Sequence, residues 1–245
     1  MRVFLSFGGN PMKEKQLPKR IIQYICGLIC MAIGLVLLKQ MALDLKDATG
    51  ISLWGVSPIT AVPDAVANIT PLTLGNATIL LHLLCVIGQV IVQKKLTLKS
   101  VLCMCVGVPF GYLVDFFMWL WGLWDPAVSI IPACLILVIG IAIQGFGVAL
   151  ISGCDMMLPA PDEMNNVIAR TYKKELSNVK MIADAIYVLI AVVINVVSLH
   201  ALSSVGISSV ASVLFTGRFV GLSKKLFPKI IMEPFFNAPA AAEKA

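Results

Sequence analysis

The sequence is poor in charged residues, since only 13% of its 245 residues are Asp, Glu, Lys or Arg. A soluble globular domain carries about 25% charged residues, so the composition excludes an ordinary soluble domain. Hydrophobic residues make up 59% of the chain. We therefore predict an integral membrane protein whose first partner is the lipid bilayer.

Signatures of enzymes are also missing. The sequence has no phosphate-binding P-loop, no H-E-x-x-H pair and no C-x-x-C pair. It has two histidines, and its seven cysteines lack metal-ligand spacing. The longest segments between apolar runs, near 40–75 and 152–178, are too short for a soluble catalytic domain. We expect no enzyme activity, no cofactor and no metal site.

Long apolar runs define the architecture. A membrane-spanning helix needs roughly 20 mostly apolar residues, and six stretches qualify, which predicts an all-α polytopic membrane protein. The last stretch is the weakest, because Ser, Thr and Gly dilute it and it contains Arg218. The predicted spans are residues 21–38, 76–93, 101–123, 127–151, 179–202 and 205–222.

Basic residues alternate between the connections of these spans. They gather in residues 13–20, 94–99, 170–180 and 224–229, while the other connections hold few, with Asp125 among their acidic residues. This is the positive-inside pattern, so both termini are expected in the cytoplasm, including a basic segment at 1–20 and a tail at 223–245. The formal net charge of +6 is then a topology signal and does not indicate nucleic-acid binding.

Two similar phrases suggest an internal duplication. VPDAVANI at 62–69 recurs as APDEMNNV at 160–167, and each is followed by a span that begins with Asn. Residues 75–92 align without gaps to 177–194, which places His82 opposite Asp184. The third span of each half contains G-x-x-x-G, at Gly107 and Gly111 and at Gly217 and Gly221.

The duplication predicts a geometry. Each unit, 21–123 and 127–222, holds three spans, so the second unit enters the membrane from the opposite side. The two units are then inverted repeats, an arrangement found in many secondary transporters. The first Pro-Asp segment is expected on the outer side and the second on the cytoplasmic side. Cys26, Cys30 and Gly34 form a small-residue stripe on the first span, which favours close helix packing.

Six spans, two P-D-x-x-x-N segments after spans one and four, and glycine-rich third spans resemble the YitT/YczE-like family of bacterial inner-membrane proteins. The resemblance covers residues 20–227 approximately. It implies the inverted-repeat fold and a multi-pass location in the bacterial inner membrane. It implies little about activity, because the family is largely uncharacterised.

The Pro-Asp segments contain the first candidate binding residues, which are Asp64 and Asn68 in one copy and Asp162, Asn165 and Asn166 in the other. Helical spacing places the members of each set on one face. Two interpretations stay open. Each segment is either an ordinary proline-started interfacial helix, or it dips into the protein and offers a helix N-terminus, a carboxylate and an amide to a solute.

Polar residues inside the spans are the remaining candidates. His82 and Asp184 are expected at matched depths and are the candidates for proton or ion coupling, or they make local hydrogen bonds. Gln144 and Asn195 either line a solute cavity or join helices by hydrogen bonds. Arg218 either extends to the cytoplasmic surface or pairs with Asp162 or Asp184.

These observations favour a transporter or exporter of a small polar or charged solute that uses alternating access. Two other classes stay open. One is a membrane-embedded substrate-binding subunit of an ATPase-driven importer. The other is a membrane regulator or scaffold that does not transport. The sequence does not identify the solute. It also leaves open whether the protein forms a homo-oligomer or works with an ATPase partner.

The charge alternation generates a topology test. In intact cells, single cysteines at positions 13, 95, 173 and 229 of a cysteine-free variant should be protected from a membrane-impermeant thiol reagent, because all four positions are predicted to be cytoplasmic. Labelling at position 95 or 173 from outside would contradict both the orientation and the inverted-repeat prediction.

Overall fold

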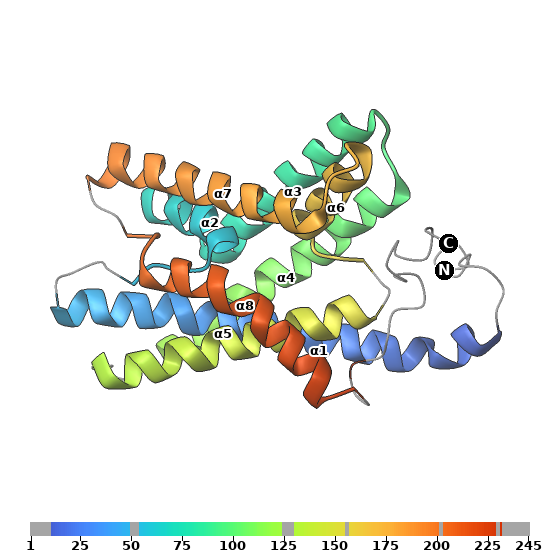
Figure 1. Cartoon of the computed structure of the whole chain (residues 1–245). Coiled ribbons are helices and arrows are strands. Elements are labelled where there is room, and N and C mark those ends of the chain that lie inside the picture. The colour runs from blue at the N-terminus through green and yellow to red at the C-terminus, as the bar shows by residue number, and fades with distance from the viewer. Residues whose placement is uncertain are drawn as a thin grey trace.

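The computed structural model describes residues 11–49, 54–123, 130–154, 157–200, 203–228 and 231. Within them the protein is all helical (Figure 1). The positions of Asp125, Lys229 and most of the predicted tail lie outside these ranges. The helices are α1 (Pro11–Thr49), α2 (Pro58–Ile69), α3 (Leu74–Gln93), α4 (Leu98–Gly122), α5 (Ile130–Gly153), α6 (Ala160–Thr171), α7 (Leu176–Leu199) and α8 (Ile207–Leu226).

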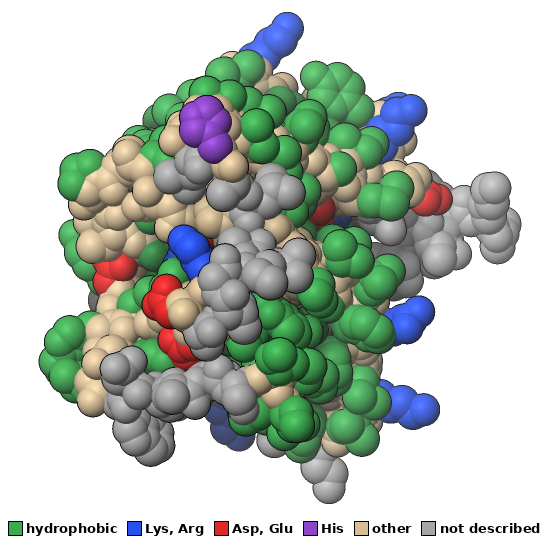
Figure 2. Space-filling view, turned by 90° about the vertical axis from the view of Figure 1, so that its left-hand side faces the viewer, with side chains coloured by type: hydrophobic (Ala, Val, Ile, Leu, Met, Phe, Trp, Pro, Cys, Tyr) green, Lys and Arg blue, Asp and Glu red, His purple; other side chains and the backbone are tan. Residues whose placement is uncertain are grey.

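Five of these helices are long and apolar enough to cross a membrane within the described residues, and they overlap the first five predicted spans. They make the chain a multi-pass membrane protein. Many large hydrophobic side chains are exposed on them, as expected for helices that face lipid. Figure 2 shows one end of the molecule, where hydrophobic side chains cover much of the surface and charged ones are scattered. The sixth predicted span forms α8, which does not reach the same apolar length and composition.

Helices α1 and α5 cross at glycines and run side by side (Figure 1). A Cβ at Gly34 would lie 2.7 Å from the carbonyl oxygen of Gly140, and one at Gly147 would lie 2.7 Å from the carbonyl oxygen of Gly27. Only glycine allows two backbones to approach so closely. The predicted stripe was right at Gly34 but wrong at Cys26, which is exposed.

Helices α3 and α4 form the second close pair. The glycines of the first G-x-x-x-G segment contact α3, since Gly111 packs against Gly75 and Gly107 packs against the ring of His82. Asp115 adds a cap at the start of α3, where its carboxylate accepts hydrogen bonds from the Gly75 N–H (2.7 Å) and the Thr73 hydroxyl (2.6 Å).

The second G-x-x-x-G segment behaves differently, because nothing lies within 4 Å of a Cβ built at Gly217 or Gly221. Helix α8 packs mainly on α5, and α7 packs mainly on α2 and α6. The repeated motif therefore has a packing partner in the first half and none in the second within the described part of the chain.

The two Pro-Asp segments form the short helices α2 and α6, and each packs against both α3 and α7 (Figure 1). Asp64 is fully buried on α2, and Glu163 and Asn165 are buried on α6. The burial of these three residues favours the interpretation in which each segment dips into the protein, whereas Asn68 near the end of α2 is exposed. The expected helix start at Pro63 is wrong, because α2 begins five residues earlier at Pro58, where proline fits the first helical turn.

The α1–α5 crossing can be tested with matched glycine substitutions. Gly34→Ala should destabilise the protein by about 1–3 kcal/mol, because its methyl group would overlap backbone atoms of α5. Gly217→Ala should leave stability unchanged or raise it slightly, because no described residue lies within 4 Å of the added methyl group. Thermal unfolding in detergent, monitored by size-exclusion chromatography, measures the stability of both variants. Equal midpoints for Gly34→Ala and the wild type would contradict the crossing.

Candidate functional site

A small cavity of about 50 Å³ lies where the first turns of α2 and α6 meet α1, α3, α4 and α5. Its wall includes Thr60 and Pro63 from α2 and Pro159, Pro161 and Asp162 from α6 and the turn before it. The two short helices come from different halves of the sequence. The cavity, which we call the central cavity, is therefore shared between them.

Polar groups reach the central cavity from two long helices, α3 and α5, and from the short helices α2 and α6. His82 is 2% exposed and stacks on Phe110, with 5.9 Å between the ring centroids. Its Nδ1 is buried and has no hydrogen-bond partner among the described residues, and the same holds for Oε1 of Gln144. Buried polar atoms without partners cost free energy. The His82 Nδ1 atom lies against Gly107 of α4, so Gln144 is the residue of the wall whose unpartnered oxygen can bind an occupant.

The short helices also bring backbone amides toward the cavity. Neither the α2 cap, Ser57, nor the α6 cap, Pro159, makes a side-chain capping hydrogen bond. Proline lacks an N–H group, so the first turn of α6 retains the N–H groups of Ala160, Asp162 and Glu163, and that of Glu163 donates to the Pro159 carbonyl. The partial positive charge of both helix starts favours negative charge in or beside the cavity.

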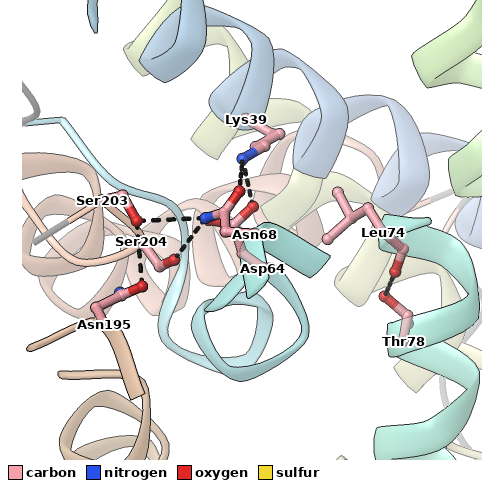
Figure 3. Close-up of polar contacts among 8 residues, drawn as sticks. All are labelled: Lys39, Asp64, Asn68, Leu74, Thr78, Asn195, Ser203 and Ser204. Carbon is pink, nitrogen blue, oxygen red and sulfur yellow. Dashed lines mark hydrogen bonds and ion pairs between the residues drawn. The ribbon is translucent and has the colours of Figure 1, made fainter. Parts of the chain in front are cut away.

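Beyond α2 lies a polar cluster, which we call the Lys39 cluster (Figure 3). The Lys39 ammonium lies 2.5 Å from Asp64 Oδ1, and these side chains are 10% and 0% exposed. Asn68 donates to Asp64 Oδ2 at 3.3 Å and to the hydroxyls of Ser203 and Ser204, each at 3.3 Å. The cluster links α2 to α1 and to the α7–α8 connection.

The same end is closed by backbone contacts between two connections. The Val56 N–H donates to the Ser204 carbonyl at 3.0 Å, and the Ser208 N–H donates to the Trp54 carbonyl at 2.7 Å. Gly55 has φ of +62° and packs directly on Gly206, a conformation that favours glycine. Together these contacts fix the start of α2 against the start of α8.

On the other side of the first turn of α6 lies a second pocket of about 190 Å³, which we call the Glu163 pocket. Lys99 lies 2.7 Å from Glu163 Oε1, and Gln89 Nε2 donates to the Ala160 carbonyl at 3.0 Å. Asp162 turns the other way and pairs with Lys180 at 2.8 Å. The two ion pairs hold α6 to α7 and to the first turn of α4.

The structure separates the predicted site residues into three groups. Asp162, His82 and Gln144 line the central cavity, whereas Asp64, Asn68 and Asn195 belong to the Lys39 cluster, in which Ser203 donates to Asn195 at 3.1 Å. Asn165 is buried with no hydrogen bond to its side chain, Asn166 is half-buried, and Asp184 has a buried oxygen without a hydrogen-bond partner. The proposed pairing of Arg218 with Asp162 or Asp184 is wrong, because Arg218 is exposed over the Phe215 ring.

Sequence reasoning missed the cationic partners. Lys99 and Lys180 were interpreted only as topology signals, and Lys39 was not considered, although it follows the first apolar run directly. A lysine at the end of a span normally extends to the membrane surface. Its burial depends on α2 placing Asp64 beside α1, for which the local sequence carries no signal.

These features define a multi-pass helical membrane protein whose two short helices border one small cavity, which is mainly apolar and contains a few polar groups. The model of a family of unknown function, DUF6198, matches residues 18–225, and the chain belongs to that family. No curated protein and no solved structure matches the chain. The resemblance to YitT/YczE-like proteins stays a prediction.

The Lys39–Asp64 pair generates a stability prediction. Lys39→Met should destabilise the protein by about 3–5 kcal/mol, because it leaves a buried carboxylate unpaired. The double variant Lys39→Met/Asp64→Leu should recover most of that loss in detergent unfolding experiments.

Lys180→Met is the matched control, because Lys180 is 46% exposed and pairs with a partly hydrated carboxylate. It should cost only about 0–1 kcal/mol. The burial argument fails if Lys39→Met is no more harmful than Lys180→Met.

Proposed function

We propose that this protein transports a small polar solute by alternating access between two inverted repeats. The observation that carries the proposal is the central cavity, in which the first turns of α2 and α6 meet beside buried polar groups without partners. Broken or short helices that point their N-termini at a shared central site are typical of inverted-repeat transporters.

The packing of the helices supports an inverted repeat. Each half has the order long, short, long, long. Exchanging the halves replaces α1 to α4 by α5 to α8 and turns most packed pairs into other packed pairs. The pair α2–α7 becomes α6–α3, α1–α4 becomes α5–α8, and α2–α3 becomes α6–α7. In this proposal α8 is the sixth span.

One pair of packed helices has no packed counterpart after this exchange, and alternating access would explain the difference. Helices α3 and α4 pack closely, whereas α7 and α8 make at most slight contact in the described residues. Two repeats with similar sequences but different conformations can exchange those conformations. The alternative state would then have α8 closed on α7, and α4 moved away from α3.

The two ends of the molecule also differ. The side chains of Lys39 and Asp64 are 10% and 0% exposed, whereas those of Lys99 and Lys180 are 42% and 46% exposed. With the orientation from the charge alternation, which places the Lys39 end outside a bacterial inner membrane, this is a state closed to the outside and looser toward the cytoplasm.

The size and chemistry of the central cavity restrict the solute in this state. About 50 Å³ holds one or two water-sized molecules, so the cavity must widen for a larger solute. The solute must supply a hydrogen bond to Gln144. His82 in the cavity wall and Asp184 on α7 are the groups we propose for proton or ion coupling.

Two alternatives predict different behaviour. A substrate-binding subunit of an ATPase-driven importer would need a partner ATPase to open the cavity. A regulator or scaffold would keep the cavity closed from both sides. Both are distinguished from a self-contained transporter by measuring from which side of the membrane a reagent can reach the cavity.

Thr78 lines the central cavity and is buried, so it reports access. In a cysteine-free variant, Thr78→Cys should react with a small impermeant thiol reagent in intact cells and also in inside-out vesicles. A disulfide formed by Asn68→Cys and Ser203→Cys, whose native side chains lie 3.3 Å apart, should abolish labelling from outside and preserve labelling from inside.

Asn68→Cys alone, treated with the same oxidant, is the control, and reduction of the disulfide should restore outside labelling. Labelling from one side only in every background would exclude alternating access. Labelling from neither side would favour a scaffold, and labelling only when a partner ATPase is co-expressed would favour the importer subunit.

A further inference from the structure

The Glu163 pocket has a buried end with two hydrogen-bond acceptors that lack partners. Gln89 is fully buried and Glu163 is 3% exposed. Because the Gln89 amide nitrogen donates to the Ala160 carbonyl, its Oε1 is left as an acceptor, and this oxygen and Glu163 Oε2 have no hydrogen-bond partner among the described residues. Such acceptors need an N–H or O–H donor.

The exposed end of the same pocket is cationic. Lys99 is half-exposed, and Arg170 is exposed without an ion pair among the described residues. The charges of Lys99, Arg170 and Glu163 leave the pocket with an excess of one positive charge. Arg170 can bind a carboxylate or phosphate with two parallel hydrogen bonds.

We propose that the Glu163 pocket binds a small zwitterion, with a primary ammonium group at Glu163 and Gln89 and an anionic group at Lys99 and Arg170. The ammonium group carries three N–H donors, enough for both unpartnered oxygens. The anionic group satisfies the cationic end. The arrangement fixes the direction of the ligand, with its ammonium buried and its anion toward water.

Simpler ligands match the pocket less well. A free cation is repelled by Lys99 and Arg170, and the single carboxylate is already paired with Lys99 at 2.7 Å. A simple anion leaves the oxygens of Gln89 and Glu163 without donors. Drug-sized ligands occupy roughly 300–1,000 Å³, so a pocket of about 190 Å³ selects a smaller molecule.

The zwitterion site is separate from the central cavity. The first turn of α6 lies between them, with Asp162 in the wall of the cavity and Glu163 in the wall of the pocket. Binding there does not require transport, and binding alone tests it. The binding proposal can therefore fail while the transport proposal holds, and the transport proposal can fail while the binding proposal holds.

The ammonium group is tested with two matched probes. Phosphoethanolamine and phosphocholine share the phosphate, but the quaternary ammonium of phosphocholine has no N–H group. In calorimetry on the full chain in detergent, phosphoethanolamine should bind at least tenfold more tightly than phosphocholine or inorganic phosphate. Equal affinities of the three probes, or no binding of any in detergent and no lipid preference, would overturn the proposal.

Variants of the pocket residues test which residue binds each end of the ligand. Glu163→Gln should weaken phosphoethanolamine at least tenfold, and Arg170→Gln should weaken it at least threefold. Because Arg170 is exposed, its variant keeps the test valid even if Glu163→Gln does not fold. Lys95→Gln, an exposed lysine outside the pocket, should bind like the wild type. Wild-type binding by folded Arg170→Gln would also overturn the proposal.

The same head-group chemistry occurs in free metabolites and in membrane lipids. The unfolding midpoint should therefore be compared in nanodiscs of phosphatidylethanolamine and of phosphatidylcholine with identical acyl chains. A higher midpoint in phosphatidylethanolamine that Arg170→Gln removes identifies a lipid head group as the ligand. Selective binding of soluble phosphoethanolamine with no lipid preference identifies a free zwitterion, and either result supports the site.

Discussion

The close approach of α1 and α5 at their glycines is the contact on which the rest of the structure depends. Because Gly34 and Gly140 bring the two backbones together, no side chain fits between α1 and α5 where the two halves of the chain meet. Met31 on α1 and Gln144 on α5 lie close to this crossing and line the central cavity. A wider crossing would therefore change the cavity directly.

Charge has a second structural role. All three ion pairs among the described residues hold one of the short helices: Lys39 pairs with Asp64 on α2, and Lys99 and Lys180 pair with α6. A buried pair is costly to break, whereas an exposed pair is weak. The difference in exposure therefore makes α6 the easier helix to move.

This difference bears on how the central cavity and the Glu163 pocket are separated. One face of the first turn of α6 borders the central cavity and the other borders the Glu163 pocket. Under the transport proposal, a displacement of that turn would join the two spaces into one path.

The sequence by itself determined the membrane class, five apolar helices and the shared face of Asp64 and Asn68, because apolar length and helical spacing act locally. Only the tertiary structure decided that Lys39 is buried against Asp64, that α2 begins at Pro58, and that the second G-x-x-x-G segment has no packing partner within the described residues. These outcomes depend on which distant segments meet. Two copies of one phrase can have equal local preferences and still acquire different partners when the chain folds.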